Sequence, residues 1–299
     1  MPNRPSGLPP LAALSRRDGC AYPDRRAAME TAGQDRETSV GVLDSFRLDG
    51  RTALVTGGSR GLGHAMATAL AEAGADLVIT GRDEETLAAT AGELRSLGRN
   101  VETIRADMGV PEECRAGLQQ CLADYGPIDI LINNIGGRRK SEPIEEQSLE
   151  SWQFVIDLNL TSCFLGTSLV GKSMIERGKG GRIINVASMN AFVSNRGIGG
   201  RSYETAKAAI VQFTRSAAAD WAPHGITVNA ICPGLFMTDA NRAWLDTRPE
   251  VIDKMVAGIP MERAGEPPEI GPLAVFLASP ASSYVTGGAH LIDGGYTLL

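Results

Sequence analysis

The sequence predicts an α/β fold built on a doubly wound, seven-stranded parallel sheet, and three observations support this. Short apolar runs alternate along the chain with segments of helical periodicity. Nearly every run is followed by such a segment, which is the crossover that parallel strands need. A glycine-rich turn directly follows the first run. Because such crossovers are right-handed, helices should cover both faces of the sheet, with a ligand crevice at the carboxyl ends of its strands.

The expected strands are short and rich in Val, Ile and Leu, as strands buried on both faces are. They lie at 52–56, 77–80, 101–104, 128–132, 182–186, 226–231 and 289–292. Helices are expected near 62–73, 84–97, 111–124, 149–177, 203–221 and 267–278. The sequence shows neither an internal repeat nor a linker to a second domain. A single domain is therefore expected.

Composition limits the classes of partner. Of the 299 residues, 43% are hydrophobic and 21% charged, which is enough for a packed core. The net charge of -6 argues against nucleic acid or an anionic membrane as partner, since both call for a basic surface. The five cysteines form no CxxC pair and the three histidines lie far apart, so neither disulfides nor a metal site is expected. No run approaches the length of a membrane span.

Residues 1–45 differ from the rest of the chain. They are rich in proline, arginine and small residues and show no sustained periodicity, so a disordered extension is expected. A targeting peptide is a weaker interpretation, because acidic residues recur and no apolar region exists. Another alternative is that Met29 is the natural start. The expected location is cytoplasmic.

The glycine-rich turn after the first strand reads Thr-Gly-Gly-Ser-Arg-Gly-Leu-Gly over 56–63. Gly57, Gly61 and Gly63 give the spacing GxxxGxG. Glycines let the backbone turn tightly and approach a pyrophosphate at the N-terminus of the following helix. The turn therefore favours dinucleotide binding, although a tight strand-to-helix turn also uses glycine for steric reasons alone.

The end of the second strand predicts which dinucleotide binds. An acidic residue there would bind the adenosine ribose and repel a 2′-phosphate, but Thr80 and Gly81 occupy this point and Arg82 follows. Arg82 and Arg60 can both face a phosphate. The alternative is that Asp83 binds the ribose of NAD, but Asp83 fits better as the N-cap of the next helix. We therefore expect NADP(H) rather than NAD(H).

Tyr203 and Lys207 stand four residues apart at the start of an expected helix and so share one face. A cation beside a tyrosine favours the phenolate, which would let the hydroxyl exchange protons near neutral pH. The plain alternative is a core tyrosine with a surface lysine one turn away.

Four motifs in order decide between these alternatives. They are the turn at 56–63, Asn133-Asn134-Ile135-Gly136 after the fourth strand, Ser188 after the fifth, and the Tyr203 and Lys207 pair. With them, residues 46–299 resemble the short-chain dehydrogenase/reductase (SDR) family. The resemblance implies a single Rossmann domain with the active site built in. One departure is Ile135, where the family usually has alanine; its bulk should not block the cofactor.

The resemblance implies the site residues. The expected catalytic residues are Asn159, Ser188, Tyr203 and Lys207, with Tyr203 as general acid or base and Asn159 supporting a proton-relay water. Ser188 and Tyr203 should bind the substrate oxygen, where charge develops. Lys207 should lower the pKa of Tyr203 and hold the nicotinamide ribose. The expected cofactor residues are Gly57, Ser59, Arg60, Gly61, Leu62, Gly63, Arg82, Asp107, Met108, Asn134, Gly136, Tyr203, Lys207, Pro233, Gly234 and Thr238.

The sequence contains fewer indications of the substrate than of the site residues. The general layout resembles gluconate 5-dehydrogenase-like reductases. Arginines lie in loops on the active-site side, at Arg138, Arg139, Arg196 and Arg201, where one can clamp a carboxylate; solvated loop arginines are the alternative. The segment 235–265 has the composition of a lid or of a subunit interface. The expected substrate contacts are Ser188, Tyr203, Asn190, Arg138, Arg196 and Phe236.

The expected activity is therefore NADP(H)-dependent interconversion of a secondary alcohol and a ketone, in a sugar acid or keto acid. A 3-oxoacyl-carrier-protein reductase is the nearest alternative. From another class comes a cofactor-binding sensor or scaffold without turnover. The resemblance also implies a homotetramer, or a dimer, with the helices at 149–177 and 203–221 and the last strand as interfaces.

Overall fold

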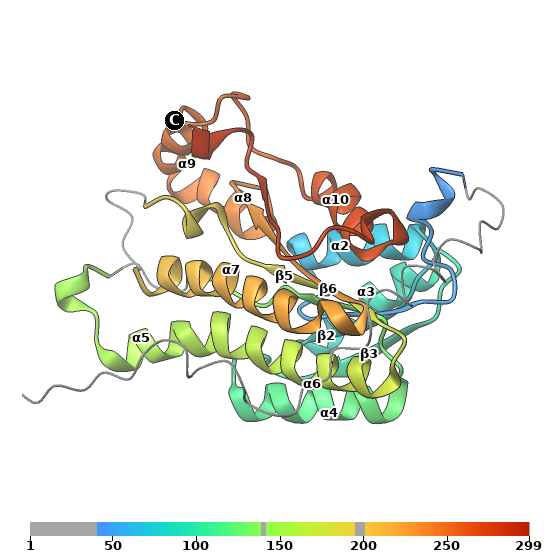
Figure 1. The fold of residues 1–299 in the computed structure, drawn as a ribbon. Helices are drawn as coiled ribbons and strands as arrows, with labels where there is room; N and C mark the ends of the chain where they lie inside the picture. The colour runs from blue at the N-terminus through green and yellow to red at the C-terminus, as the bar shows by residue number, and fades with distance from the viewer. Residues whose placement is uncertain (1–40, 139–141, 195–200, 299) are drawn as a thin grey trace, which may run out of the picture. The chain divides into compact units, whose positions relative to one another are not determined.

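The computed structural model describes residues 41–138, 142–194 and 201–298. Val42–Leu299 forms one compact unit (Figure 1). The extension expected at 1–45 lies outside the described residues except for 41–45.

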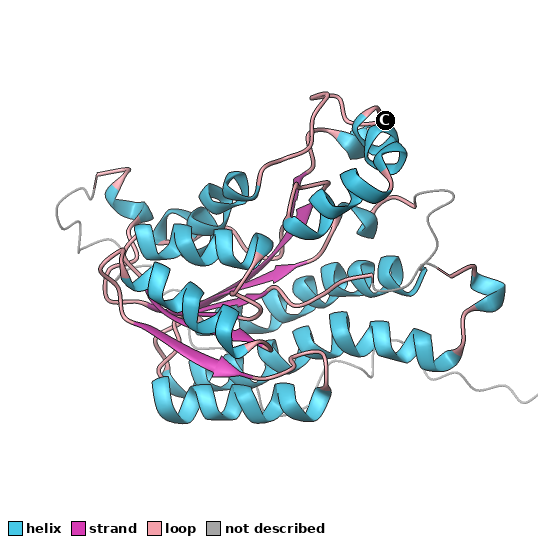
Figure 2. Ribbon diagram, turned by 180° about the vertical axis from the view of Figure 1, so that it is seen from behind, coloured by secondary structure: helices cyan, strands magenta, loops and turns pink. Residues whose placement is uncertain are grey.

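The unit is organised around a seven-stranded sheet of order β3-β2-β1-β4-β5-β6-β7, in which every pairing is parallel. Figure 2 shows the strands running between layers of helices. The doubly wound parallel sheet expected from the sequence is confirmed. The strands are β1 (Thr52–Val55), β2 (Asp76–Gly81), β3 (Val101–Arg105), β4 (Ile130–Asn133), β5 (Gly181–Val186), β6 (Ile226–Pro233) and β7 (Ala289–Ile292).

The two faces of the sheet are buried by separate helix layers. On β1, Ala53 and Val55 belong to one buried cluster and Leu54 to the other, as the alternation of side chains along a strand requires. The first cluster packs against α2 (Gly61–Glu72), α3 (Glu84–Arg95) and α10 (Gly271–Ala278). The second packs against α4 (Pro111–Tyr125), α6 (Ser162–Arg177) and α7 (Arg201–Trp221).

Shorter helices lie in the connections. Beyond β6 lie α8 (Asp239–Thr247) and α9 (Pro249–Val256), and Ile252 of α9 belongs to a separate small cluster with Leu235 and Ile259. The remaining short helices are η2 (Asp44–Phe46), η3 (Ile144–Glu146), η5 (Met189–Ala191), η6 (Ala222–His224), η7 (Pro267–Ile270), η8 (Pro280–Ser282) and η9 (Tyr296–Leu298).

The helix expected at 149–177 is not uniform. It consists of α5 (Leu149–Ile156), a π-helical turn η4 (Asp157–Thr161) and α6. Within the π turn, the Asn159 side chain donates a hydrogen bond of 2.9 Å to the Val155 carbonyl. Wide turns of this kind mark functional positions more often than regular helix does. Helical periodicity in the sequence does not reveal the extra residue.

By length and composition this helical stretch, Leu149–Arg177, could cross a membrane, so the sequence-based statement that no run approaches that length is wrong for this segment. This segment is apolar because it packs against the rest of the protein: 56% of its apolar window is buried inside the protein.

A buried polar network joins the sheet to α6 and α7. The Asn133 amide donates to Thr167 (3.0 Å) and to Asn185 (2.9 Å), and the Asn185 amide donates to Thr214 (2.9 Å). All four residues are buried. Because buried polar groups must be satisfied, the network fixes how both helices lie on β4 and β5. Gly166 on α6 makes the room that the network needs.

We expect Gly166→Ala to destabilise the protein by about 1–3 kcal/mol, as overpacking does. A Cβ at this position would lie 2.1 Å from Asn133 Oδ1, so Asn133 would have to leave its partners. Gly92→Ala on α3 is the matched control, because a Cβ there meets nothing within 4 Å and should stabilise the helix by up to about 1 kcal/mol. Urea unfolding measures both; a Gly166→Ala variant as stable as the wild type would contradict the role of the network.

Candidate active site

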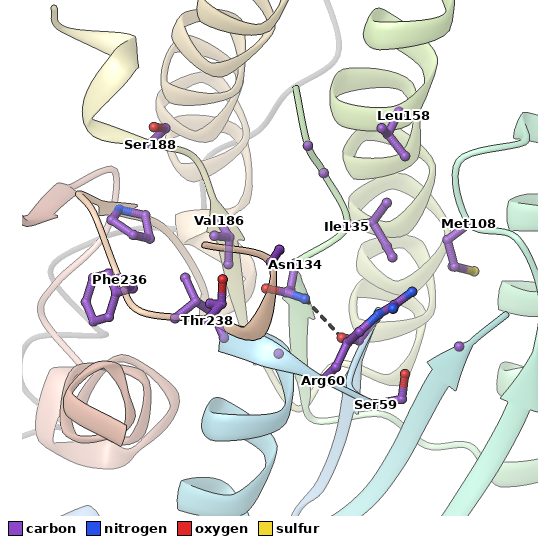
Figure 3. Close-up of a pocket in the computed structure, with 18 of the residues that line it drawn as sticks. Ser59, Arg60, Met108, Asn134, Ile135, Leu158, Val186, Ser188, Phe236 and Thr238 are labelled. Atoms are coloured by element: carbon purple, nitrogen blue, oxygen red, sulfur yellow. Dashed lines mark hydrogen bonds between the residues drawn. The ribbon is translucent and has the colours of Figure 1, made fainter. Parts of the chain in front are cut away.

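A cavity of about 680 Å³ opens where the sheet reverses its strand order, between β1 and β4. Val55 and Ile132 are register partners near the ends of these strands, so the turns that follow them meet at one edge of the sheet. This is where ligands bind in open α/β sheets. Figure 3 shows side chains from the turns after several strands lining this cavity.

The glycine-rich turn forms one wall. Gly57 and Gly61 have φ of 65° and 57°, which glycine adopts without strain. A Cβ on Gly63 would lie 2.2 Å from the Gly57 carbonyl oxygen, so only glycine fits there. α2 begins at Gly61, and its N-cap Arg60 makes no side-chain capping bond. The amide groups of this helix end can therefore bind an anion.

The loop after β4 is joined to the glycine-rich turn. The Asn134 side chain donates to the carbonyls of Thr56 (3.1 Å) and Gly57 (3.2 Å), and its backbone N–H donates to the Thr56 hydroxyl (3.0 Å). Ile135 lies below the turn, since a Cβ on Gly57 would meet its Cδ1 at 2.7 Å. Ile135 also lines the cavity (Figure 3). The two turns thus form one continuous wall.

Asn159 lies behind this loop. Its Oδ1 accepts from the Gly137 N–H and its Nδ2 donates to the Gly137 carbonyl, both at 3.0 Å. A Cβ on Gly136 would come within 2.6 Å of Asn159 Oδ1 and 2.8 Å of Lys207 Nζ. Gly136 therefore brings the loop into close contact with both side chains. Asn159 is fully buried and does not line the cavity.

Ser188, Tyr203 and Lys207 meet at the cavity. Ser188 follows β5, and its hydroxyl accepts from the Asn190 N–H at 3.1 Å and is hydrogen-bonded to the Tyr203 side chain. Lys207 Nζ donates to the Val186 carbonyl at 2.8 Å and lies 5.7 Å from the centroid of the Tyr203 ring. The helix α7 and the end of β5 thus place a hydroxyl, a phenol and an amine together.

Burial dominates the protonation of this group. It lowers the pKa of Lys207 to about 8. Burial also raises the pKa of Tyr203, against the lowering effects of the hydrogen bond to Ser188 and of the Arg138 charge. Burial outweighs both lowering effects, and the charge among them is that of Arg138, whose Cζ lies 5.1 Å from the Tyr203 ring centroid. That Lys207 also lowers the pKa of Tyr203 stays a prediction.

The far end of the cavity carries two arginines and an aspartate. Arg60, Arg82 and Asp107 line it, and Arg82 Nη1 lies 3.3 Å from Asp107 Oδ2. Asp83 caps α3, as expected, because its Oδ1 accepts from the Thr86 N–H at 2.8 Å. The structure thus uses Asp83 at the helix end and turns Arg82 toward the cavity.

The segment after β6 closes the other side. Phe236 and Thr238 line the cavity (Figure 3). The Asn241 side chain donates to the Phe236 carbonyl at 2.7 Å. Phe236 also forms a bridge with Gly265 at the far end of the segment. α8 and α9 lie between these two points, in the segment whose composition predicted a lid or a subunit interface.

A family model described as Enoyl-(Acyl carrier protein) reductase matches residues 57–297. The 2-dehydro-3-deoxy-D-gluconate 5-dehydrogenase of Dickeya dadantii is 40% identical over 258 residues, covering 85% of this chain and 98% of its own. The chain belongs to the short-chain dehydrogenase/reductase family. It is an oxidoreductase of this family, as the resemblance in the motifs implied.

Two further SDR relatives are informative. A crystal structure of gluconate 5-dehydrogenase from Burkholderia cenocepacia, in complex with NADP and tartrate, is 37% identical with a TM-score of 0.79, covering 86% of this chain and 99% of that chain. The 3-oxoacyl-[acyl-carrier-protein] reductase of Synechocystis is 37% identical over 253 residues, covering 84% of this chain and 98% of its own.

Most of the predicted site residues of this SDR line the one cavity. Gly61, Asn159, Arg138 and Asn190 do not: Gly61 lies within the turn, Arg138 over the Tyr203 ring, and Asn190 is buried beside Ser188. Arg196, like Arg139 and Lys140, lies outside the described residues. Those that line the cavity are Gly57, Ser59, Arg60, Leu62, Gly63, Arg82, Asp107, Met108, Asn134, Gly136, Ser188, Tyr203, Lys207, Pro233, Gly234, Phe236 and Thr238.

Sequence reasoning overlooked two kinds of residue. Leu158 and Val186 line the cavity but read as ordinary core residues. Glu204 is buried beside Tyr203 and binds Arg201. A signal for Glu204 existed, because positions 204, 207, 211, 214 and 218 form the buried stripe of α7. Within 41–138, 142–194 and 201–298, no three His, Cys, Asp or Glu side chains are placed to hold a metal ion.

The buried Lys207 should make the free energy of unfolding depend on pH. The folded protein releases this proton at a pKa of about 8, whereas the unfolded chain has the ordinary value of 10.5. Between these values the unfolded chain binds more protons, so stability rises with pH; below pH 8 the buried cation lowers stability by a constant amount.

Relative to Lys207→Met, the wild type should therefore gain up to about 3 kcal/mol between pH 8 and pH 10.5, at 1.36 kcal/mol for each pH unit. Urea unfolding of both proteins at about pH 7.5, 9 and 10.5 measures the gain. Using the difference between the two proteins removes the contributions of the other titrating groups. A constant difference across this range would show that Lys207 keeps its ordinary pKa.

Proposed function

We propose that this SDR interconverts a secondary alcohol and a ketone in a sugar acid or keto acid, using NADP(H), with Tyr203 as the general acid or base. The observation that carries the proposal is the arrangement of Ser188, Tyr203 and Lys207 at one end of a cavity whose other end carries Arg60 and Arg82. A bound dinucleotide would extend along the cavity and contact both of these ends.

The chain's residues fit the cofactor. Glycines at 57, 61 and 63 leave the backbone of the turn open to a pyrophosphate, and the first turn of α2 offers its N–H groups. When bound, NADP(H) supplies or accepts the hydride. Arg60 and Arg82 supply positive charge for a 2′-phosphate, which a chain with a net charge of -6 must provide locally. These features favour NADP(H) over NAD(H).

The proton moves through Tyr203. In reduction its hydroxyl gives a proton to the substrate oxygen, and in oxidation it accepts one. Ser188, already hydrogen-bonded to Tyr203, donates to the same oxygen as negative charge develops there. Lys207 lies at the same end of the cavity, with Nζ 5.7 Å from the Tyr203 ring centroid, and by family resemblance would also hold the nicotinamide ribose. Asn159 holds Gly137 and thereby keeps the loop after β4 in place.

The keto acid substrate is supported by Arg138. Its guanidinium lies over the Tyr203 ring and is of the kind that binds a carboxylate. The related gluconate 5-dehydrogenase was crystallised with tartrate, a dicarboxylate. Asn190, Phe236 and Arg196 complete the proposed substrate contacts.

A 3-oxoacyl-carrier-protein reductase is the second candidate, because a relative with this activity is 37% identical. An acidic carrier protein needs a basic docking surface, whereas this chain is acidic overall. A non-catalytic sensor or scaffold is the candidate from another class. The presence of Asn159, Ser188, Tyr203 and Lys207 in one site favours turnover.

We also propose a homotetramer acting in the cytoplasm, without nucleic-acid or membrane partners. Large apolar side chains are exposed along α5 and α6, at Leu149, Phe154 and Phe164, and on β7 at Leu291. Such faces are typical of subunit interfaces. The four described cysteines are all unpaired and buried, which fits a reducing compartment.

NADPH oxidation with 5-ketogluconate tests the activity, and Tyr203→Phe tests the mechanism. We expect the wild type to reduce the keto acid with a higher kcat/KM than an acetoacetyl thioester. Tyr203→Phe should lower kcat by about 10²–10⁴-fold while NADPH binding, followed by fluorescence, stays unchanged. Full turnover by the variant would refute the assignment. Tight NADPH binding by the wild type without turnover of keto acids, sugars or thioesters would instead indicate a sensor.

Arg82→Asp tests the cofactor. Removing a charge-assisted bond to the 2′-phosphate and adding a carboxylate should lower the ratio of kcat/KM for NADPH over NADH by about ten- to a hundredfold. The matched control is Arg215→Asp, an exposed residue on α7, which changes the net charge equally. An unchanged ratio in Arg82→Asp would show that this arginine does not select the cofactor.

A further inference from the structure

We infer that Glu204 is a positioning residue, which holds Arg138 over the Tyr203 ring so that its guanidinium can receive the carboxylate of the substrate. The inference rests on the proposed function and concerns a residue that is neither part of the catalytic group nor a lining residue of the cavity.

Glu204 is a buried carboxylate directly after the general acid or base. Its side chain is only 8% exposed, and it lies on the inward stripe of α7. A buried carboxylate is costly unless charged partners and hydrogen bonds satisfy it. Its position therefore calls for partners from the surrounding loops.

Arg201 fixes the carboxylate. Arg201 Nη1 donates to both oxygens of Glu204, at 2.8 Å to Oε1 and 2.6 Å to Oε2. The Ser194 hydroxyl donates to Oε2 at 3.4 Å. Because Arg201 stands one turn before Glu204 on α7, this pair belongs to the helix end itself.

Arg138 is oriented by this fixed carboxylate. Its Nη2 lies 3.9 Å from Glu204 Oε1, and its Cζ lies 5.1 Å from the Tyr203 ring centroid. Two neighbouring side chains of α7 thus hold the guanidinium, one by charge and the other through its aromatic face. Burial lowers the pKa of Arg138, and the charge of Glu204 acts in the opposite direction.

The same loop is tied to α7 at a second point. The Gln147 amide donates to the Ser202 hydroxyl at 2.9 Å, and Ser202 directly precedes Tyr203. The connection between β4 and α5 is therefore held against the first turn of α7 on both sides of Tyr203. Among the described residues of this connection, Arg138 places its guanidinium over the Tyr203 ring.

The cluster contains charges of both signs. Arg138 and Arg201 are cations, and Glu204 is the anion that contacts both of them. The charge of Glu204 and its role in positioning Arg138 predict opposite effects on binding of the substrate carboxylate. As a charge alone it would repel the substrate carboxylate, whereas as a positioning residue it strengthens binding by holding Arg138 in place.

Whether KM for 5-ketogluconate rises or falls in Glu204→Gln therefore distinguishes these two effects. We expect Glu204→Gln to raise KM for 5-ketogluconate about tenfold and to leave KM for NADPH within about twofold, corresponding to about 1.4 kcal/mol lost at the carboxylate. Arg138→Ala should raise KM for 5-ketogluconate at least as much. The double variant should match Arg138→Ala alone, because Glu204 acts through Arg138.

An unchanged or lower KM in Glu204→Gln would overturn the inference, and so would additive effects in the double variant. Glu204→Asp keeps the charge on a shorter side chain and should give an intermediate KM; if Glu204→Gln does not fold, an unchanged KM in Glu204→Asp overturns the inference instead. Glu176→Gln, which removes an exposed ion pair with Lys172 on α6, is the matched control and should change neither KM.

Failure of the proposed function is recognisable separately. A wild type that reduces no keto acid removes the proposed function and this inference together. A wild type that reduces 5-ketogluconate while Glu204→Gln has the wild-type KM leaves the proposed function intact and removes only the role of Glu204.

Discussion

The buried amine of Lys207 is the interaction on which the arrangement of the active site depends. A buried ammonium is costly unless hydrogen-bonded, and here Nζ donates to the Val186 carbonyl at the end of β5. Gly136 lies against it without a side chain, which leaves room for the amine. Lys207 therefore contacts the end of β5 and the loop after β4 from its place on α7, and Tyr203 takes its position from the same helix.

Much of this could be predicted from the sequence. The strands β1, β2, β4 and β5 contain short apolar runs, and a parallel sheet follows from the helices between them. The turn at 56–63 and the cap at Asp83 depend on residues close in the chain, so local patterns revealed them. The main catalytic candidates followed from the order of several motifs, each of which is weak by itself.

Other features depend on contacts between distant segments, which patterns along the chain do not show. The π turn at Asp157–Thr161 depends on how Asn159 meets Gly137, 22 residues earlier. Arg138 meets Glu204 only because the loop after β4 reaches α7. The pKa of Tyr203 rises because the whole site is buried, an effect that the spacing of Tyr203 and Lys207 cannot predict. Local order is readable from sequence, whereas burial and charge balance are not.

The close packing around Gly57, Gly63 and Gly136 has a consequence for engineering this protein. A Cβ on Gly57 or Gly63 would meet the Asn134 side chain, and a Cβ on Gly136 would meet Asn159 and Lys207, so a side chain at any of these glycines would disturb the wall of the cavity. Single substitutions at these glycines are therefore unsuitable for redesign. Arg138, Glu204 and the segment with α8 and α9 are not among the nearest neighbours of these three glycines. A library aimed at new substrates should therefore vary those positions and leave the three glycines untouched.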